Sequence, residues 1–349
     1  MASDLISQIA SLYFRGRIEE MNDYRLNASD IQSEQLFNLL REAEGTSLSK
    51  KYDFRSIVSY QEFRERVPLL SAETIKPFIQ RIENGEVNVL WPGLPKRIFP
   101  SFNETRIPIS DQAITETFIQ GIYDGYAIHL RLHPESRLFG GFFLTVGNDP
   151  ELPLIDELDQ FLKGNEPFIN SLLNIPKHIG TKQQLAEINA SQLIKEIGPN
   201  KISCFKGTPK ALEQLINATR NEDGTLASFL TDAELLFHKT TMLSSLLKEM
   251  KQAVNLPIPI QSAYCTPEGF VGIQDNPGDD SFMLMLDLST FYEFIPTDRT
   301  NSQPMPLEDV EVNRDYQLVL TNCSGLWRYL SDGPKLRFVS VKPYRFLLV

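Results

Sequence analysis

The chain has 349 residues, of which 42% are hydrophobic and 23% charged, and charges of both signs are interspersed along it. This composition is typical of a folded globular protein and excludes a disordered chain. The net charge of -11 repels phosphate backbones and anionic lipid surfaces. We therefore expect neither a nucleic acid polymer nor a membrane as partner. A single hydrophobic core usually splits beyond about 250 to 300 residues, so the length predicts two fused lobes.

The cysteines and the first residues of the chain indicate in which cellular compartment the protein is expected. Cys204, Cys265 and Cys323 are too scattered for a disulfide framework, and no CxxC pair suggests zinc. The start of the chain is interrupted by Asp4 and by charges from Arg15 onward, unlike a signal peptide. No run of about 18 apolar residues is present. These features favour the cytoplasm.

Helical spacing dominates the first part of the chain. Apolar residues recur at that spacing within residues 5–13 and again within 36–40. A helix is predicted over residues 71–84, with Ser71 as N-cap and Gly85 just beyond its end. A further helix should open at residue 208, with proline in its first helical position.

From residue 281 the apolar period changes to that of strands, in FMLMLD, FYEFI, YQLVLT, LRFVS and YRFLLV. Helices followed by strands predict an α/β protein, with an α/β body over about residues 1–280 and a β-rich lobe over about 281–349. The chain ends in an apolar strand without a polar tail. Either the ancestral chain continued there, or the strand is tied into a sheet.

The common catalytic signatures are absent. There is no Walker loop, no GxGxxG after a strand, no HExxH and no GxSxG. The four histidines, at positions 129, 133, 178 and 238, lack metal-ligand spacing. We expect each of them to be a surface histidine or a core histidine with satisfied hydrogen bonds.

Several turn-rich segments recur at intervals: VPLL at 67–70, GEVNVLWPG at 85–93, RIPIS at 106–110, AYCTPEGFVGIQD at 263–275 and SGLWRYLSDG at 324–333. In this order they resemble the Gretchen Hagen 3 auxin-responsive family of acyl-acid amido synthetases. The resemblance implies the large domain of an adenylate-forming enzyme, of the acyl-CoA synthetase and luciferase type, with two sheet subdomains and a β-rich lobe. In the family a small C-terminal domain follows, which we expect to be absent here.

The resemblance also implies a chemistry. Family members activate a carboxylic acid with ATP and Mg²⁺, release pyrophosphate, and let an amino-acid amine attack the acyl-adenylate. Such a reaction requires donors around the phosphates, a carboxylate on the metal and an aromatic surface for adenine.

The phosphate loop of the family corresponds to SFNETRIPIS, in which Ser101 and Thr105 match the family's hydroxyl residues. Glycines that the family has in this loop are missing, and Glu104 adds a negative charge. Without glycine the backbone cannot wrap closely around a phosphate. We expect that this loop no longer cradles a triphosphate.

The adenine and metal segment corresponds to YCTPEG. By resemblance Tyr264 stacks on the base, Thr266 lies beside the nucleotide, and Glu268 is the catalytic residue that holds Mg²⁺. Pro267 stands where the family has a hydroxyl residue, and proline offers neither a hydroxyl nor a backbone donor. The alternative is that Tyr264 is a core aromatic and Glu268 is solvated.

Two further segments depart from the family. In LLFHKT, Lys239 and Thr240 replace two glycines that let the backbone approach adenine, and Lys239 is either a side chain crowding that pocket or a salt-bridged surface lysine. By resemblance Arg328 and Asp332 also contact the nucleotide, but Asp332 stands one position before the family's ribose-binding aspartate. A bulge could absorb this shift, or Asp332 could point away.

These departures favour a degenerate, non-catalytic homologue that retains binding of a carboxylic acid or a nucleotide. The alternative is an active acyl-adenylating ligase whose C-terminal domain is supplied by another chain. A third reading is a structural protein that binds a protein partner or forms a homodimer through an exposed apolar face.

Overall fold

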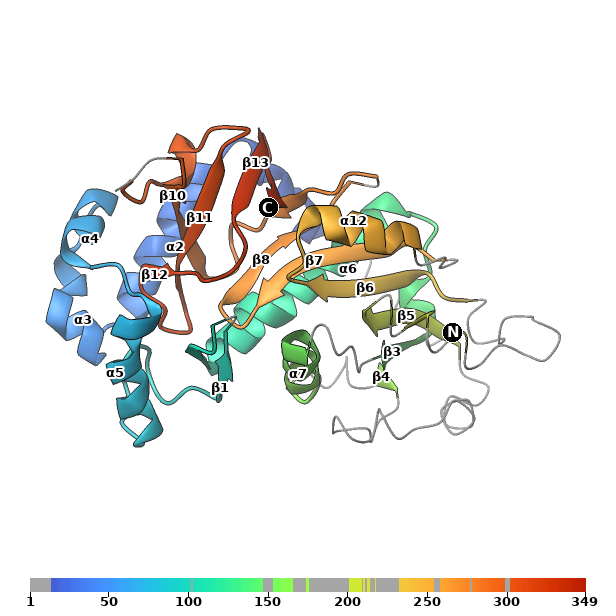
Figure 1. The fold of residues 1–349 in the computed structure, drawn as a ribbon. Helices are drawn as coiled ribbons and strands as arrows, with labels where there is room; N and C mark the ends of the chain where they lie inside the picture. Colours follow the sequence, from blue (N-terminus) through green and yellow to red (C-terminus); the bar gives the residue numbers. More distant parts are fainter. Residues whose placement is uncertain are drawn as a thin grey trace. The chain divides into compact units, whose positions relative to one another are not determined.

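The computed structural model describes residues 14–101, 103–146, 153–165, 174–175, 201–208, 210, 212–213, 217, 232–253, 258–276, 278–298 and 302–349. The chain forms two compact units (Figure 1). The first consists of Met1–Met21, Ile122–Tyr264 and Ile273–Asp280, and the second of Asn22–Gly121, Cys265–Gly272 and Ser281–Val349. Each unit is described by itself.

The second unit begins with helices and ends with strands. Its helical elements are η1 (Asp23–Arg25), α2 (Ala28–Glu42), α3 (Ser47–Tyr52), η2 (Phe54–Ser56), α4 (Tyr60–Arg66), α5 (Ala72–Glu83), the π-helix η3 (Ala113–Ile119) and η6 (Leu307–Asp309). The sequence predicted α5 correctly. The Ser71 hydroxyl accepts hydrogen bonds from amides of the first turn, and the Thr74 hydroxyl accepts one from the Ser71 amide, which completes a capping box.

The strands of the second unit form an antiparallel sheet in the order β10, β11, β13, β14, β9, β8, with β12 also paired to β11. Their bounds are β8 (Gly269–Ile273), β9 (Phe282–Leu284), β10 (Thr290–Pro296), β11 (Asp315–Asn322), β12 (Tyr329–Leu330), β13 (Leu336–Val341) and β14 (Tyr344–Leu348). A separate hairpin pairs β1 (Arg97–Pro100) with β2 (Arg106–Ile109). Five of these strands lie where the alternating pattern after residue 281 predicted them.

Helix α2 packs against β10 and β11 of this sheet (Figure 1). Its predicted apolar stripe, Leu36, Leu39 and Leu40, is buried. The buried Gln32 amide donates to the carbonyl of Leu286, before β10, at 2.7 Å and to that of Thr290, the first residue of β10, at 3.0 Å, and it accepts from the Tyr292 amide at 2.8 Å. Because both polar atoms of this side chain are hydrogen-bonded, these bonds offset the cost of removing the amide from water.

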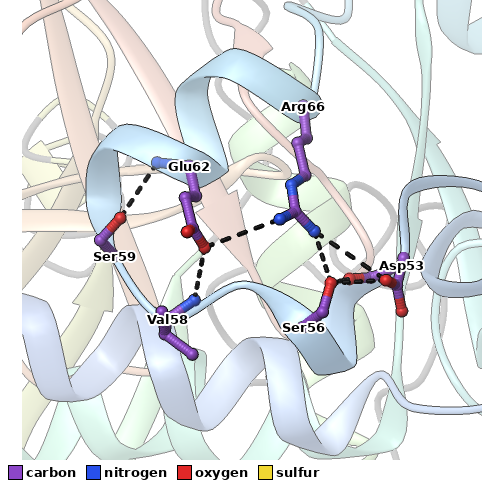
Figure 2. Close-up of polar contacts among 6 residues, drawn as sticks. All are labelled: Asp53, Ser56, Val58, Ser59, Glu62 and Arg66. Atoms are coloured by element: carbon purple, nitrogen blue, oxygen red, sulfur yellow. Dashed lines mark hydrogen bonds and ion pairs between the residues drawn. The ribbon is translucent and has the colours of Figure 1, made fainter.

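The connection into α4 is held by surface hydrogen bonds (Figure 2). Ser59 caps the helix by accepting from the Glu62 amide at 3.2 Å, and the Glu62 carboxylate accepts from the Val58 amide at 3.0 Å. Arg66, near the end of the helix, donates to the Ser56 hydroxyl at 2.5 Å and lies 3.8 Å from Glu62. Such exposed contacts each contribute about 1 kcal/mol or less, so we assign them to local structure.

The first unit contains a parallel sheet in the order β7, β6, β5, β3, β4. Its elements are α6 (Gln120–Leu132), η4 (Leu138–Gly140), β3 (Phe142–Val146), α7 (Pro153–Lys163), β4 (Asn174–Ile175), β5 (Ile202–Gly207), β6 (Leu235–Thr240), α12 (Ser244–Ala253) and β7 (Ile260–Thr266), and the unit boundaries fall inside α6 and β7. Strands β5 and β6 are buried along their whole length, as expected for central strands of a parallel sheet.

Close packing of glycines in α6 against aromatic rings yields a first prediction. A Cβ at Gly121 would lie 2.5 Å from the ring of Phe270, which is shorter than any real contact. We expect Gly121→Ala to reduce the free energy of unfolding by roughly 1 to 3 kcal/mol through overpacking. At the helical Gly16 a Cβ meets nothing within 4 Å, so Gly16→Ala is the matched control.

Chemical denaturation of both variants would measure this difference. Alanine is the better helix former, so the control should be neutral or stabilised by up to about 1 kcal/mol. Equal stability of the two variants would contradict the packing argument.

The fold confirms the predicted α/β class. Some sequence predictions, however, fall on residues that the structure does not describe. The stripe within residues 5–13 and most of the helix predicted from residue 208 lie outside the described residues. No helix in the described ranges has both the length and the apolar character needed to cross a bilayer.

Candidate functional site

Glu268 lies in the tight turn between β7 and β8, in the second unit. The turn is fixed by a 3.1 Å hydrogen bond from the Glu268 amide to the Thr266 hydroxyl and by a 2.7 Å bond from the Asn322 amide to the Glu268 carbonyl. The side chain is only 2% exposed, and its Oε2 accepts a hydrogen bond from the Ser331 hydroxyl. Glu268 is therefore not the solvated residue that one reading of the sequence allowed.

Burial, together with the nearby Asp332 carboxylate and against the hydrogen bond from Ser331, raises the pKa of the Glu268 carboxyl to about 8. In this environment the carboxyl is predominantly neutral at pH 7. A neutral carboxyl is a poor ligand for a hard cation such as Mg²⁺.

Asp332 follows β12 and points toward the turn that joins β1 to β2. Its Oδ2 accepts from the Ser101 hydroxyl at 2.7 Å and from the Asn103 amide at 3.1 Å. The other oxygen of Asp332, Oδ1, is buried and has no hydrogen-bond partner among the described groups, and the same holds for Oε1 of Glu268. The one-residue shift in the sequence thus aims Asp332 at the predicted phosphate loop.

The Ser101–Thr105 turn is compact. The Ser101 amide donates to the Thr105 carbonyl at 2.7 Å, and the Glu104 amide donates to the Ser101 carbonyl at 3.2 Å. Glu104 has a φ of 58°, in the left-handed region that a side chain adopts at a cost. Ser101 and Thr105 are buried, while Asn103 and Glu104 are exposed.

Tyr329, in β12, completes the cluster. Burial raises the pKa of its phenol, and the carboxylates of Glu268 and Asp332 raise that pKa further, against the hydroxyls of Thr105 and Ser101. These five side chains therefore share one electrostatic environment. Sequence analysis did not single out Tyr329 or Ser331, although both lie beside Asp332 in the quoted SGLWRYLSDG segment.

Arg328 lies in the same unit but has other partners. Its guanidinium binds Glu293 through two hydrogen bonds of 2.8 Å and donates two more to the carbonyls of Arg64 and Val67. Tyr60 also donates to Glu293, at 2.9 Å. These protein groups occupy the guanidinium, and a contact of Arg328 with a nucleotide stays a prediction.

The remaining predicted residues lie in the first unit. Tyr264, at the end of β7, is 1% exposed, and stacking on a base stays a prediction for it. Lys239 is buried and forms an ion pair with Asp159 of α7, so the reading as a surface lysine is wrong. In a strand that is buried throughout, both faces are covered, which local sequence does not reveal.

One buried histidine agrees with the sequence prediction and another does not. His129 is buried, and its Nε2 lies 3.1 Å from the Ser136 hydroxyl, as expected for a satisfied core histidine. His238 in β6 is fully buried, yet neither ring nitrogen has a partner among the described groups. In the described part of the chain, no three His, Cys, Asp or Glu side chains gather as a metal cluster would require.

Comparison with solved structures identifies the class of the fold. The chain superposes on an acyl acid amido synthetase in complex with 2,4-DB with a TM-score of 0.69 and 18% identity, covering 96% of this chain and 70% of that one. It superposes on a 2-hydroxyisobutyryl-CoA ligase with a TM-score of 0.52 and 12% identity, covering 92% and 66% of the two chains. The fold is that of the large domain of adenylate-forming enzymes.

Comparison with sequences identifies the family. The model of the GH3 family N-terminal domain matches residues 17–124, and that of the GH3 family central domain matches residues 283–341. The chain belongs to the GH3, or Gretchen Hagen 3, family, as its turn-rich segments predicted.

The relatives are named as amido synthetases. A jasmonoyl–L-amino acid synthetase of Nicotiana attenuata is 22% identical, over 92% of this chain and 68% of the relative. An indole-3-acetic acid-amido synthetase of Arabidopsis thaliana is 22% identical, over 93% of this chain and 69% of the relative.

Proposed function

We propose that this chain is a non-adenylating member of the GH3 family, which binds a small carboxylic acid without activating it by ATP. The acid is suggested by the relatives, whose names specify jasmonoyl and indole-3-acetic acid substrates. The loss of activation is argued from the residues of the predicted phosphate and metal sites.

One observation carries the proposal: four described donors of the Ser101–Thr105 turn, the amides of Ser101, Asn103 and Glu104 and the Ser101 hydroxyl, are used within the protein. The amides of Ser101 and Glu104 close the turn on itself, and the Asn103 amide and the Ser101 hydroxyl bind Asp332. A triphosphate needs several such donors directed at its oxygens. Here a carboxylate of the chain takes two of them, and it would repel a phosphate.

Two further features support the same conclusion. Glu268, the metal ligand implied by the resemblance, is buried, hydrogen-bonded to Ser331 and held largely neutral at pH 7. Pro267 beside it removes both a hydroxyl and a backbone donor. Binding of Mg²⁺ would first require ionising this carboxyl, at a free-energy cost that rises as the pH falls below its pKa.

A second candidate function, an active acyl-adenylating ligase, has one observation in its favour. Oε1 of Glu268 and Oδ1 of Asp332 are both buried, neither accepts a hydrogen bond from a described donor, and the two carboxyls interact with each other, as carboxylates that share a cation do. In that case Glu268 would hold Mg²⁺, which would neutralise charge on the phosphates. The other half of the catalytic machinery would come from a C-terminal domain on another chain.

Calorimetric titration with ATP and Mg²⁺ decides between the two candidates, because every catalytic version requires nucleotide binding first. We expect no binding at roughly millimolar nucleotide, equivalent to a binding free energy weaker than about -4 kcal/mol. We also expect no carboxylate-dependent exchange of pyrophosphate into ATP, with indole-3-acetic acid or jasmonic acid as the acid. Micromolar binding of ATP would overturn the proposal.

The same assay should be repeated with a separately expressed C-terminal domain of a relative. Exchange that appears only with the added domain would establish the second candidate. Binding of the acid alone, measured in the same calorimeter, tests the retained function independently of ATP.

A further inference from the structure

We infer that the Ser101–Thr105 turn is an oxyanion-binding site whose resident ligand is the carboxylate of Asp332. The inference deepens the proposed function, on which it rests, by naming the group that keeps phosphates out. It also makes Asp332 the residue that determines which anions this turn can bind.

The geometry is that of an anion and its donors. A hydroxyl and a backbone amide converge on one oxygen, Oδ2 of Asp332, at 2.7 and 3.1 Å. Hydrogen bonds to an ionised acceptor are stronger than those between neutral groups, and charged acceptors are typical ligands of such convergent donors. The two donors lie 229 and 231 residues away from Asp332 in sequence, so tertiary structure builds the site.

Both sides of this contact are anchored. Ser101 follows β1 and Thr105 precedes β2, and the Ser101 amide to Thr105 carbonyl bond closes the hairpin between them. On the other side, Ser331 is fixed through its hydroxyl by Glu268, and its amide donates to the Leu318 carbonyl at 3.0 Å. Asp332 is therefore presented to the donors by a rigid neighbour.

The site is open enough for exchange with a solvent anion. Asn103 is exposed and Asp332 is half-buried, so the amide to carboxylate bond lies at the surface. Two acidic groups lie near the contact, the exposed Glu104 next to Asn103 in sequence and the buried Glu268 beside Asp332, and each would weaken the binding of an added anion. Removal of the Asp332 side chain would leave both donors free to bind an oxyanion of similar size.

Three variants of the full chain test the inference, with inorganic pyrophosphate as the probe and without Mg²⁺. Asp332→Ala vacates the site, and we expect it to bind pyrophosphate at least roughly tenfold more tightly than the wild type. Asp332→Asn is the matched control, since its amide oxygen still fills the site, and we expect no gain. Ser101→Ala combined with Asp332→Ala removes one donor and should lose most of the gain.

The inference is overturned if Asp332→Ala binds no better than the wild type, or if Asp332→Asn gains as much, which would indicate a general effect of charge. Hydrogen exchange of the Asn103 amide supplies a second measurement that does not depend on the affinity of any variant. It should be protected in the wild type, exchange rapidly in Asp332→Ala, and regain protection when pyrophosphate is added. Rapid exchange in the wild type would overturn the inference by itself.

Failure of the inference about Asp332 can be distinguished from failure of the proposed function. Binding of ATP by the wild type would overturn the non-adenylating proposal, and protection of Asn103 in the nucleotide-free protein would still report the contact with Asp332. The converse result is that the wild type binds no ATP while Asp332→Ala binds pyrophosphate no more tightly than the wild type does. That result would leave the non-adenylating proposal in place and would contradict only the role assigned to Asp332.

Discussion

Replacing Arg328 by alanine should reduce the free energy of unfolding by about 3 to 5 kcal/mol. The guanidinium and its partner Glu293 are 6% and 1% exposed, and two 2.8 Å hydrogen bonds join them. The substitution would leave the Glu293 carboxylate buried with the Tyr60 hydroxyl as its remaining partner among the described groups, and it would remove donors from two main-chain carbonyls. An unpaired buried charge costs far more than the pair itself contributes.

The chain supplies a matched control at its surface. Arg337 binds Asp315 through the same two-bond geometry, at 2.6 and 2.9 Å, but it is 44% exposed. We expect Arg337→Ala to cost about 1 kcal/mol or less, because solvent screens the pair. Urea denaturation of both variants measures the difference, and similar losses in the two would contradict the role assigned to burial.

A double variant distinguishes the contribution of the Arg328–Glu293 ion pair from that of the other hydrogen bonds of Arg328. Combining Arg328→Ala with Glu293→Gln removes the unpaired charge, so we expect the double variant to be more stable than Arg328→Ala alone. An additive loss would mean that Arg328 acts mainly through its bonds to the carbonyls of Arg64 and Val67.

Much of the architecture follows from local pattern. The segments after residue 281 are recognisable as strands because they are short apolar runs; buried and exposed side chains alternate in the first part of β13, whereas β9 and nearly all of β10 are buried on both faces. The capping box at Ser71 and Thr74 uses residues three positions apart, so the start of α5 can be identified from the sequence alone. Features of this kind depend on neighbours along the chain.

The partners of polar groups could not be predicted in this way. The family resemblance implied that Ser101, Glu268 and Asp332 belong to one nucleotide site, which stays a prediction, and it gave no indication that Asp332 binds the Ser101 hydroxyl. That contact depends on how a hairpin and a distant strand end approach one another in three dimensions. For the same reason the LLFHKT segment gave no sign that Lys239 would pair with Asp159 inside the first unit.

His238 should make the protein sensitive to acid. Burial, together with the positive charge of Lys251, lowers the pKa of its imidazole from 6.5 to about 3. As the pH falls below 6.5, the unfolded chain binds a proton that the folded chain cannot accept. Stability is therefore lost progressively between pH 6.5 and 3, by about 1.4 kcal/mol for each pH unit below 6.5, or about 2 kcal/mol at pH 5.

Substitution of His238 by leucine, which has a similar volume, should remove this contribution and flatten the acid slope. It should also raise the free energy of unfolding at pH 7.5 by roughly 1 to 3 kcal/mol, because two buried nitrogens without a hydrogen-bond partner among the described groups are removed. His238→Gln separates the two effects: it does not titrate, but it keeps a buried polar group. Denaturation midpoints of the three proteins between pH 7.5 and 5 measure both quantities.

Both variants should lose the contribution of His238 to the dependence of stability on pH. Only the leucine variant should be more stable than the wild type at pH 7.5. The buried His129, whose pKa is lowered to about 4 by burial and by His133, is present in all three proteins and cancels in the comparison. A parallel acid slope in the wild type and in both variants would mean that the imidazole of His238 is protonated as readily in the folded chain as in the unfolded one. In that case a water molecule or a group outside the described residues would have to satisfy its ring nitrogens.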